Sequence, residues 1–367
     1  MNLSTSHSKR FPTAFIVTAI VVVILEAAVF SGTYLLGDVS NVSIVYKEEF
    51  IEEPGDYDVV IFGASRALAI DARSLEGLDN RFRTVYNCAL PHLGTSLEYA
   101  LTLRKYLENK EKPDVILLSI PPEMFGITDK EGIFAGDPQG EMGRFRRFFS
   151  CVDLIRFVPF REKWTLVADY AYTLLPSANH AFFVRRIFPL DKIPEWRMRL
   201  GWARAHCGNN RAALEHMIQT NGQVIYHADA VVSEEAFDTG LPAQKDDRIS
   251  LDNVSRAHNV TRFIEIACEE NIPVLFFFMP VIDERYQVMK ERGFMDAVEA
   301  KLRTWEKDYP NVRYCRFYDI AYDRQYFGDW SHLNAAGVER FNTELRRNFS
   351  RLMDAAHNVS RALPRHP

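Results

Sequence analysis

Two short stretches, far apart along the chain, carry residue types that together could perform nucleophilic catalysis. Near the C-terminus, residues 328–337 have the sequence Gly-Asp-Trp-Ser-His-Leu-Asn-Ala-Ala-Gly, which places Asp329 three residues before His332. At this spacing the carboxylate can hydrogen-bond the imidazole Nδ1, which leaves Nε2 free to act as a base. Far upstream, an apolar run of the buried type leads into a small-residue turn that ends on Ser65. The sequence therefore predicts Ser65 as nucleophile, His332 as general base and Asp329 as the acid that orients the base.

These residues can meet only if the fold brings both stretches to one edge of a sheet. Short apolar runs alternate with amphipathic helical patterns, which is typical of parallel strands buried on both faces. The strands are expected at 59–62, 85–89, 114–120, 273–280 and 312–318, and the helices at 94–109, 253–270, 294–308 and 334–353. This alternation predicts an α/β fold with a doubly wound, flavodoxin-like parallel sheet of about five strands. Ser65 follows the first strand and His332 the fifth, so both are expected at the carboxyl edge, where such sheets bind ligands.

Shifts in composition divide the chain into segments. They are a cytoplasmic N-terminus (1–10), a transmembrane anchor (11–36), a polar linker (37–56), the first half of the sheet domain (57–124), an insertion (125–250), the second half of the sheet domain (251–354) and a tail (355–367). The insertion is rich in Phe, Trp, Arg, Gly and Pro without a clean period, and we expect it to be largely helical. The tail is expected to be loosely ordered.

The N-terminal apolar segment decides where the rest of the chain is located. Lys9 and Arg10 precede the apolar residues 11–36, and about 20 apolar residues span a bilayer as a helix. The basic flank favours a cytoplasmic N-terminus, so a single-pass signal-anchor would hold the main domain outside the cytoplasm, in the periplasm or at the cell surface. A cleaved signal peptide is the alternative, but its apolar region usually has only roughly 7–15 residues. We favour the uncleaved anchor, in which Glu26 would snorkel, be protonated, meet a partner helix or lie near the interface of a tilted span.

Composition argues against several classes of function. The 44 basic and 49 acidic residues give a formal net charge of −5, and no long basic run is present, so nucleic acid is not an expected partner. The five cysteines show no C-x-x-C spacing, which argues against zinc, iron–sulfur and thioredoxin-like chemistry. Chemistry of the Ser–His–Asp type needs no metal and no organic cofactor, and we expect neither.

Each of the two stretches also has a structural interpretation. Ser65 could simply cap the helix that follows it, and residues 329–332 could form an N-terminal helix cap with a satisfied histidine. Asp319 could replace Asp329 as the orienting acid, although its position at the end of a strand favours a turn residue. The combination is more demanding than either part, because both stretches fall where the fold predicts a shared cleft. That coincidence favours the catalytic interpretation.

The same residues resemble the SGNH/GDSL hydrolase superfamily. The nucleophile block corresponds to Phe-Gly-Ala-Ser-Arg at 62–66, and the acid/base block to Asp-Trp-Ser-His-Leu-Asn-x-x-Gly at 329–337. The similarity covers about residues 57–125 and 251–350 and leaves the insertion unmatched. Within the superfamily, the chain looks most like membrane-tethered extracytoplasmic members that acylate cell-envelope polymers. These include the alginate O-acetylation proteins and the D-alanine transfer protein of teichoic acid synthesis.

The resemblance implies an oxyanion hole built from backbone N–H groups. The family pattern gives Ser65 as one donor and Gly94 as the second, with Ala89 as the next choice in the second block. The third block of hydrolytic members carries an asparagine that completes the hole, but here the third strand ends Ser-Ile-Pro-Pro-Glu at 119–123. Loss of one oxyanion donor typically costs about 10²–10³ in turnover. This departure favours a slow transferase, or an enzyme whose oxyanion hole is completed by a partner protein, over an esterase with high turnover.

Three classes of function remain open. The resemblance implies a serine acyltransferase or acylesterase that acts on O-acyl groups of cell-envelope polysaccharide through an acyl-serine intermediate. Its partners would be an acylated polysaccharide or acyl donor and an integral membrane acyl-transfer protein. The alternatives are a general secreted GDSL esterase or lipase, and a non-catalytic domain of the same fold that binds polysaccharide or scaffolds an assembly.

Overall fold

The computed structural model describes residues 10–36, 42–90, 97–126, 164, 167, 195–200, 209–232, 251–254 and 258–362. The chain divides into two compact units, one of residues 1–39 and 134–197 and the other of residues 40–133 and 198–367. The second unit contains the sheet and all three residues of the predicted Ser–His–Asp set.

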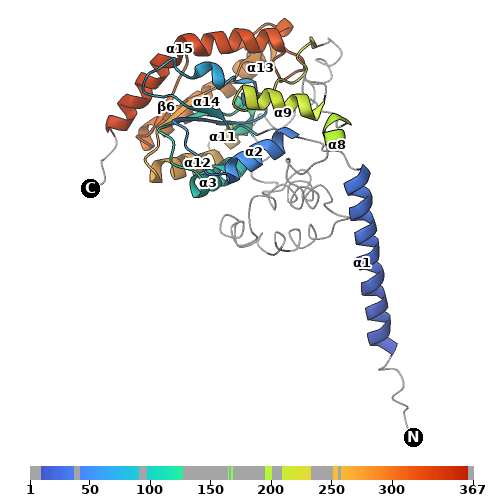
Figure 1. Cartoon of the computed structure of the whole chain (residues 1–367). Helices are drawn as coiled ribbons and strands as arrows, with labels where there is room; N and C mark the ends of the chain where they lie inside the picture. Colours follow the sequence, from blue (N-terminus) through green and yellow to red (C-terminus); the bar gives the residue numbers. More distant parts are fainter. Residues whose placement is uncertain are drawn as a thin grey trace. The chain divides into compact units, whose positions relative to one another are not determined.

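The second unit is built on a parallel sheet of five strands in the order β2-β1-β3-β4-β6 (Figure 1). The strands are β1 (Val59–Gly63), β2 (Val85–Asn87), β3 (Val115–Ser119), β4 (Val274–Phe277) and β6 (Val312–Tyr314). Each neighbouring pair is parallel, with Val59 opposite Val115 in the β1–β3 pair. The predicted α/β fold with a parallel sheet of about five strands is therefore confirmed. The strand order reverses between β1 and β3, and ligands bind at such switch points in open α/β sheets.

Helices and short elements surround this sheet. The described helices of the unit include α2 (Val42–Glu52), α3 (Leu97–Asn109), α9 (Asn210–Gln219), α11 (Leu251–Val254), α12 (His258–Glu269), α13 (Asp283–Glu291), α14 (Phe294–Asp308) and α15 (Ala335–Ala362). The described residues also form four 3₁₀ turns, which are η1 (Ala67–Ala69), η2 (Arg73–Leu75), η3 (Pro122–Gly126) and η7 (Arg324–Tyr326). A second, two-stranded sheet pairs β5 (Val281–Ile282) with β7 (Ala321–Tyr322).

The strands β1, β3 and β4 are almost entirely apolar because helices cover both faces of the sheet. Every residue of these strands is buried. On one face, the ring of Phe62 packs against Tyr106 of α3 and Phe263 of α12. On the other face, Phe277 stacks with Phe341 of α15, which lies across the sheet from α3 and α12 in Figure 1. Burial on both faces explains why these runs show no polar alternation in the sequence.

Residues 42–52 of the predicted polar linker instead form α2, which packs into the core. The acidic residues of this segment suggested a solvated chain, but Phe50 stacks on Tyr86 of β2. Lys47 is completely buried, and this burial lowers its pKa to about 7. Its Nζ donates a hydrogen bond to the carbonyl oxygen of Asn87 at 2.6 Å. The helix α2 therefore belongs to the domain that carries the site.

The C-terminal part of the predicted insertion also packs on the sheet domain. The N–H of Val224 donates to the carbonyl of Leu68 at 2.8 Å, and the N–H of Asn87 donates to the carbonyl of Asn221 at 2.9 Å. Residues 209–232 thus join the loops that follow β1 and β2. Most of the rest of the insertion lies outside the described residues. Part of the predicted tail continues α15, where Val359 is buried.

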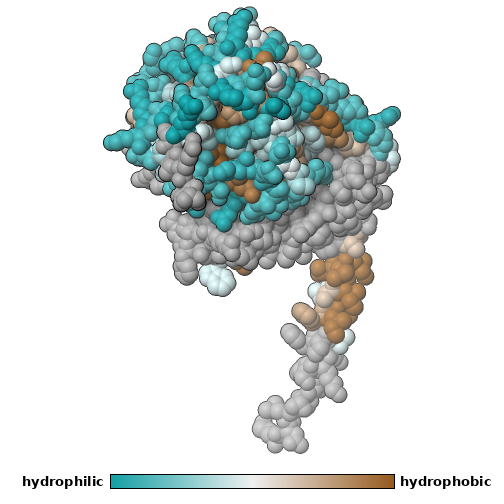
Figure 2. All heavy atoms as spheres, turned by 60° about the vertical axis from the view of Figure 1, so that its left-hand side comes forward, coloured by the Kyte–Doolittle hydropathy of each residue, from teal (hydrophilic) through white to brown (hydrophobic). Residues whose placement is uncertain are grey.

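The first unit contains α1 (Arg10–Leu36), a helix of 27 residues that covers the predicted anchor. Large apolar side chains between residues 15 and 25 are exposed along it and form the brown stretch of α1 in Figure 2. Within the part of the chain that the structure describes, no helix combines the length and apolar character needed to cross a membrane. The anchor over 11–36 stays a prediction.

Candidate active site

The nucleophile turn follows directly from the end of β1. Ser65 is the second residue after Gly63, and η1 begins two residues later at Ala67. A Cβ atom on Gly63 would lie 2.6 Å from the Cβ of Ala67, so the tight return of the chain requires glycine. Asn87 holds the turn in place, because its Nδ2 donates to the carbonyl of Ala67 at 2.8 Å. Ser65 is thereby fixed, half-buried, at the carboxyl edge of the sheet.

Asp329 organises the acid/base loop through both of its carboxylate oxygens. Oδ1 accepts the backbone N–H groups of Ser331 and His332, each at 2.7 Å. Oδ2 lies 2.8 Å from Nδ1 of the His332 ring. An ionised carboxylate can only accept hydrogen bonds, so Nδ1 carries the proton and Nε2 presents its lone pair. The spacing of acid and histidine orients the imidazole in the way that the sequence predicts.

The residues after His332 start the last helix and fix the loop to its neighbours. Asn334 caps α15, since its Oδ1 accepts the N–H of Gly337 at 3.0 Å. Its Nδ2 donates to the carbonyl of Ala230 at 3.0 Å, in the segment contributed by the insertion. A Cβ atom on Gly337 would clash with the backbone carbonyl oxygen of Tyr326, which explains the glycine at this place. The block from 329 to 337 is therefore a structural unit as well as a source of two functional groups.

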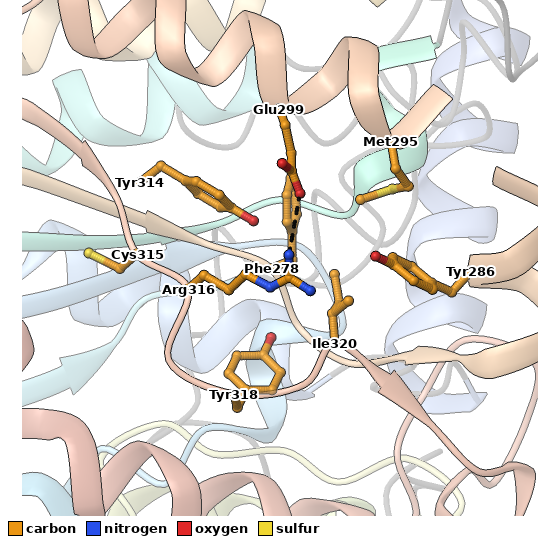
Figure 3. A pocket seen from close by; sticks show the side chains of 9 residues that line it. All are labelled: Phe278, Tyr286, Met295, Glu299, Tyr314, Cys315, Arg316, Tyr318 and Ile320. Atoms are coloured by element: carbon orange, nitrogen blue, oxygen red, sulfur yellow. Dashed lines mark ion pairs between the residues drawn. The ribbon is translucent and has the colours of Figure 1, made fainter. Parts of the chain in front are cut away.

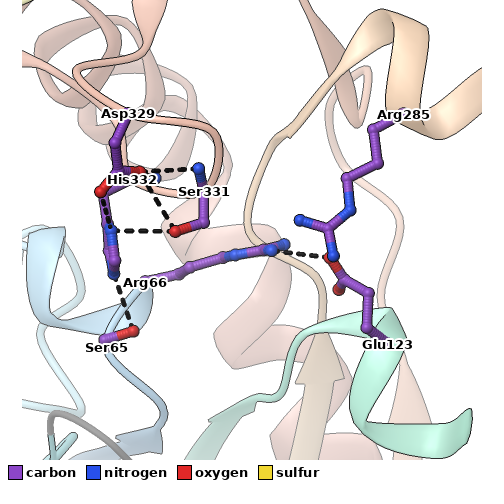
Figure 4. A network of polar contacts seen from close by, with 7 residues as sticks. All are labelled: Ser65, Arg66, Glu123, Arg285, Asp329, Ser331 and His332. Atoms are coloured by element: carbon purple, nitrogen blue, oxygen red, sulfur yellow. Dashed lines mark hydrogen bonds and ion pairs between the residues drawn. The ribbon is translucent and has the colours of Figure 1, made fainter. Parts of the chain in front are cut away.

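The structure brings the three predicted residues into one hydrogen-bonded line (Figure 4). His332 Nε2 lies 2.8 Å from Oγ of Ser65, although the two residues are 267 positions apart. The side chains of His332 and Asp329 are 21% and 28% exposed, so solvent or a substrate can reach the line. Ser331 lies beside it, with its Oγ 3.1 Å from Asp329 Oδ1 and 2.9 Å from His332 Nδ1. The arrangement has the geometry of a nucleophile, a base and an orienting acid.

Opposing effects set the charge state of Asp329. Burial would raise the pKa of this carboxyl, but the hydrogen bond from the His332 ring, together with the backbone N–H groups of Ser331 and His332, lowers it well below its usual range. The acid therefore stays ionised at neutral pH. An ionised Asp329 stabilises the imidazolium that forms when His332 takes a proton.

Two residues beside the line belong to the C-terminal part of the predicted insertion. The Nε2 of His227 lies 3.6 Å from Asp329 Oδ2, and the ring of Tyr226 lies 5.1 Å, centre to centre, from the His332 ring. His227 has a positive φ of 51°, a left-handed conformation that is uncommon outside glycine. No local sequence pattern indicates these contacts, because they depend on how residues 209–232 fold back over the site.

The predicted oxyanion donors have different positions. Among the described residues, the backbone N–H of Ser65 has no hydrogen-bond partner, which leaves it available to an oxyanion. The N–H of Ala89 is already occupied, since it donates to Oδ1 of Asn87 at 3.0 Å. Gly94 lies outside the described residues. Ser65 is therefore the one donor of the three that the described geometry presents unoccupied.

A buried ionic cluster lies just beyond the end of β3. Glu123 follows β3 and accepts a hydrogen bond from Nη2 of Arg66 at 2.7 Å. The same Oε1 also forms an ion pair with Nη2 of Arg285, on α13. In Figure 4 the Arg66 side chain extends from the nucleophile turn, past Ser331, towards Glu123. No local pattern in the sequence predicts this cluster, because Arg66, Glu123 and Arg285 lie far apart along the chain.

A separate pocket opens beside the ends of β4 and β6 (Figure 3). The hydroxyl groups of Tyr286, Tyr314 and Tyr318 point towards its centre. Arg316 and Glu299 form an ion pair of 3.8 Å across it. The empty space, open solvent included, is about 290 Å³, and no residue of the Ser–His–Asp line contributes to the lining.

Among the described residues, no group of three or more His, Cys, Asp and Glu side chains is arranged to hold a metal ion. No protein-family model matches the chain, and no curated protein matches it.

Proposed function

We propose that the chain is a serine acyltransferase or acylesterase of the SGNH type. The observation that carries the proposal is the pair of 2.8 Å contacts that joins Ser65 Oγ, His332 and Asp329. Residues from opposite ends of the domain meet at the switch point of a parallel sheet, where ligands bind in such folds. A strand order that begins 2-1-3-4 also agrees with a doubly wound, flavodoxin-like sheet. A helix cap alone would need no contact between His332 and Ser65.

The mechanism proceeds through an acyl-serine. His332 Nε2 takes the Ser65 proton while Oγ attacks the carbonyl carbon of the acyl donor. The backbone N–H of Ser65 then stabilises the developing oxyanion. When the tetrahedral intermediate collapses, the bond to the leaving oxygen breaks and His332 returns the proton to that oxygen. A sugar hydroxyl or water, deprotonated by His332, next attacks the acyl-serine. The bond between the acyl carbon and Ser65 Oγ breaks, His332 returns the proton to Oγ, and the acyl group leaves on the acceptor oxygen.

The makeup of the site favours transfer over rapid hydrolysis. The third block supplies Glu123, which is engaged with Arg66, in place of an asparagine donor. A hole with fewer donors is expected to turn over about 10²–10³ times more slowly for each missing donor. A polymer hydroxyl as the acceptor, in place of water, is what the resemblance to membrane-tethered acylating members implies. O-acyl groups of a cell-envelope polysaccharide are the substrate class that the resemblance implies.

The location is part of the proposal. Exposed apolar side chains along α1, such as Phe15 and Leu25, agree with a single-pass signal-anchor, with the sheet domain held outside the cytoplasm. The resemblance adds an integral membrane protein that supplies the acyl groups. This position would give the enzyme access to an envelope polymer as acceptor.

Hydrolysis of p-nitrophenyl acetate by the full-length chain tests the proposal. We expect slow release of nitrophenol that is lost in Ser65→Ala and retained in Ser350→Ala, which removes an exposed hydroxyl on α15. Equal rates in Ser65→Ala and the parent chain would contradict it. With a soluble glycan present, transfer of the acetyl group to sugar hydroxyls would identify a transferase, and acetate alone an esterase.

A further inference from the structure

The cluster formed by Arg66, Glu123 and Arg285 lies at the nucleophile turn and is electrostatically unbalanced. The side chains of Arg66 and Arg285 are only 7% and 8% exposed. Two guanidinium groups share one carboxylate, so the buried cluster has a net charge of +1. Burial lowers the pKa of Arg285 to about 10, and repulsion by Arg66 contributes to this shift. Charges removed from water normally occur in compensated sets.

The hydrogen bonds of the cluster are also incomplete. Nη1 of Arg66 and both Nε and Nη1 of Arg285 are buried without a hydrogen-bond partner among the described residues. Glu123 uses Oε1 for both arginines, while its Oε2 is likewise buried without a partner. Buried polar groups nearly always have a partner, and a buried donor without one lowers the stability of the folded state. Three spare donors and one surplus positive charge suit a ligand that is an anion and an acceptor.

We propose that Arg66 and Arg285 form a subsite for an oxyanion, a carboxylate or phosphate group, beside the nucleophile. Guanidinium groups bind these anions with paired, charge-assisted hydrogen bonds. Arg66 is the residue next to Ser65, and its side chain extends from the nucleophile turn to Glu123, so the subsite lies about one arginine side chain away from Ser65 (Figure 4). An anionic group of the donor or acceptor bound here would hold its acyl or hydroxyl group near Ser65. This role in substrate positioning rests on the proposed function, whereas the binding of the anion does not.

Trp330 closes the subsite on its outer side. Its ring lies over the Arg285 guanidinium, with 4.8 Å between the guanidinium carbon and the ring centre. Trp330 is 40% exposed, so its ring borders both the Arg285 guanidinium and solvent. An entering anion displaces this ring and takes over its contact with Arg285. Because Trp330 lies between Asp329 and Ser331 in the chain, displacement of its ring also shifts the acid/base loop.

Calorimetric titration of the full-length Ser65→Ala chain tests the subsite. Sodium phosphate and sodium acetate are the probes, each compared with sodium chloride at the same ionic strength, up to about 0.15 M. We expect saturable binding of at least one probe, and the stronger of the two indicates whether phosphate or carboxylate is preferred. Arg66→Gln and Arg285→Gln should weaken it about tenfold or more, since each removes a charged donor. Arg346→Gln, which removes a charge from α15, should leave the affinity unchanged.

Glu123→Gln should strengthen anion binding, whereas the arginine variants should weaken it. It keeps both arginines and raises the net charge of the cluster from +1 to +2, so it should bind the anion more tightly than the parent chain. If the variant is too unstable for calorimetry, the increase in melting temperature caused by the probe is measured instead. We expect an increase that is larger in Glu123→Gln than in the parent chain, and smaller in Arg66→Gln. A purely structural cluster predicts equal increases in all three.

The outcomes separate the subsite from the proposed function. No saturable binding in folded protein, or equal binding in Arg66→Gln and Arg346→Gln, overturns the subsite. If Ser65 then still reacts with a fluorophosphonate, the serine enzyme stands without it. Binding with the expected variant order, but with no reaction at Ser65, keeps the anion site and removes the catalytic proposal.

Discussion

Two polar clusters meet at the nucleophile turn, and they differ in how completely their hydrogen bonds are made. In the Ser65–His332–Asp329 line, each side chain has a partner at hydrogen-bonding distance. Asp329 also accepts hydrogen bonds from two backbone N–H groups. In the neighbouring cluster, Arg66 and Arg285 keep buried donors without partners among the described residues. The first cluster is set before a substrate arrives, as nucleophilic catalysis requires. The second is completed only when an anion enters.

The largest expected effect tests whether the first cluster acts as a unit. Ser65→Ala and His332→Ala should each lower kcat for p-nitrophenyl acetate at least about 10³-fold, because either change removes the activated hydroxyl. The double variant should be little worse than each single one. Kinetics of the three variants and the parent chain measure this. Mild losses that multiply in the double variant would mean that the two side chains act separately.

Asp329→Asn should have the next largest effect on turnover. The amide cannot hold the proton on Nδ1 of His332 or stabilise its positive charge, so kcat should fall about 10²–10⁴-fold. The backbone contacts to Oδ1 can persist, and the melting temperature should change far less than turnover. Asp319→Asn is the matched control, because this exposed residue accepts a turn hydrogen bond from the N–H of Ala321 and lies outside the Ser–His–Asp line. A greater loss of kcat in Asp319→Asn than in Asp329→Asn would identify Asp319 as the acid that orients His332.

The second cluster should matter most for stability. Glu123→Gln leaves two buried guanidinium groups without a counter-charge, and removal of one partner of a buried ion pair costs about 3–5 kcal/mol of unfolding free energy. Chemical unfolding of the parent chain and the variant measures this loss. Glu339→Gln breaks an exposed pair with Arg346 and should cost less than about 1 kcal/mol. Equal losses of unfolding free energy in Glu123→Gln and Glu339→Gln would contradict a stabilising role for the buried carboxylate of Glu123.

The same carboxylate should make stability depend on acidic pH. Burial opposes ionisation of Glu123, but Arg285 and Arg66 outweigh it and lower its pKa from 4.5 to about 2. A depressed pKa in the folded state contributes stability above the unfolded value, here 4.5, and that contribution is lost as the pH falls towards 2. The difference in unfolding free energy between the parent chain and Glu123→Gln should therefore shrink across this interval. A difference that stays constant from pH 5 to about pH 2 would argue against an ionised Glu123.

His227 should give the smallest effect. It lies 3.6 Å from Asp329 and its side chain is 53% exposed, so solvent screens its interaction with the carboxylate. We expect His227→Gln to change kcat/KM by less than about threefold at neutral pH. A pH profile of kcat/KM for both proteins measures it. A loss comparable to that of Asp329→Asn would make His227 a part of the base assembly.

The line and the arginine cluster also differ in how well the sequence predicts them. The residues of the line occur at the ends of recognisable elements: Ser65 after a fully apolar strand, and Asp329 and His332 before a capped amphipathic helix. Because parallel strands end at a common edge, local pattern and topology together suffice to predict their meeting. Spacing also predicts the bond between Asp329 and His332, since it depends on one loop.

Other parts of the molecule depend on contacts that no local pattern contains. Glu123 and Arg66 are 57 residues apart, and each looks like an ordinary surface charge in its own segment. The helix α2 was missed because its acidic residues outweigh Phe50 and Ile51 in composition, although both are buried. Residues 209–232 were assigned to an insertion, yet the N–H of Val232 donates to the carbonyl of Phe327 beside the acid/base loop. Long-range packing decides these placements.

The most direct test is the reaction of the folded full-length chain with a fluorophosphonate, followed by peptide mapping of the modified residue. We expect a single modified site at Ser65, and a much slower reaction in His332→Ala, because the imidazole activates the hydroxyl. A folded protein that shows no modification of Ser65, or an equal rate without the His332 imidazole, would contradict a serine nucleophile at the end of β1.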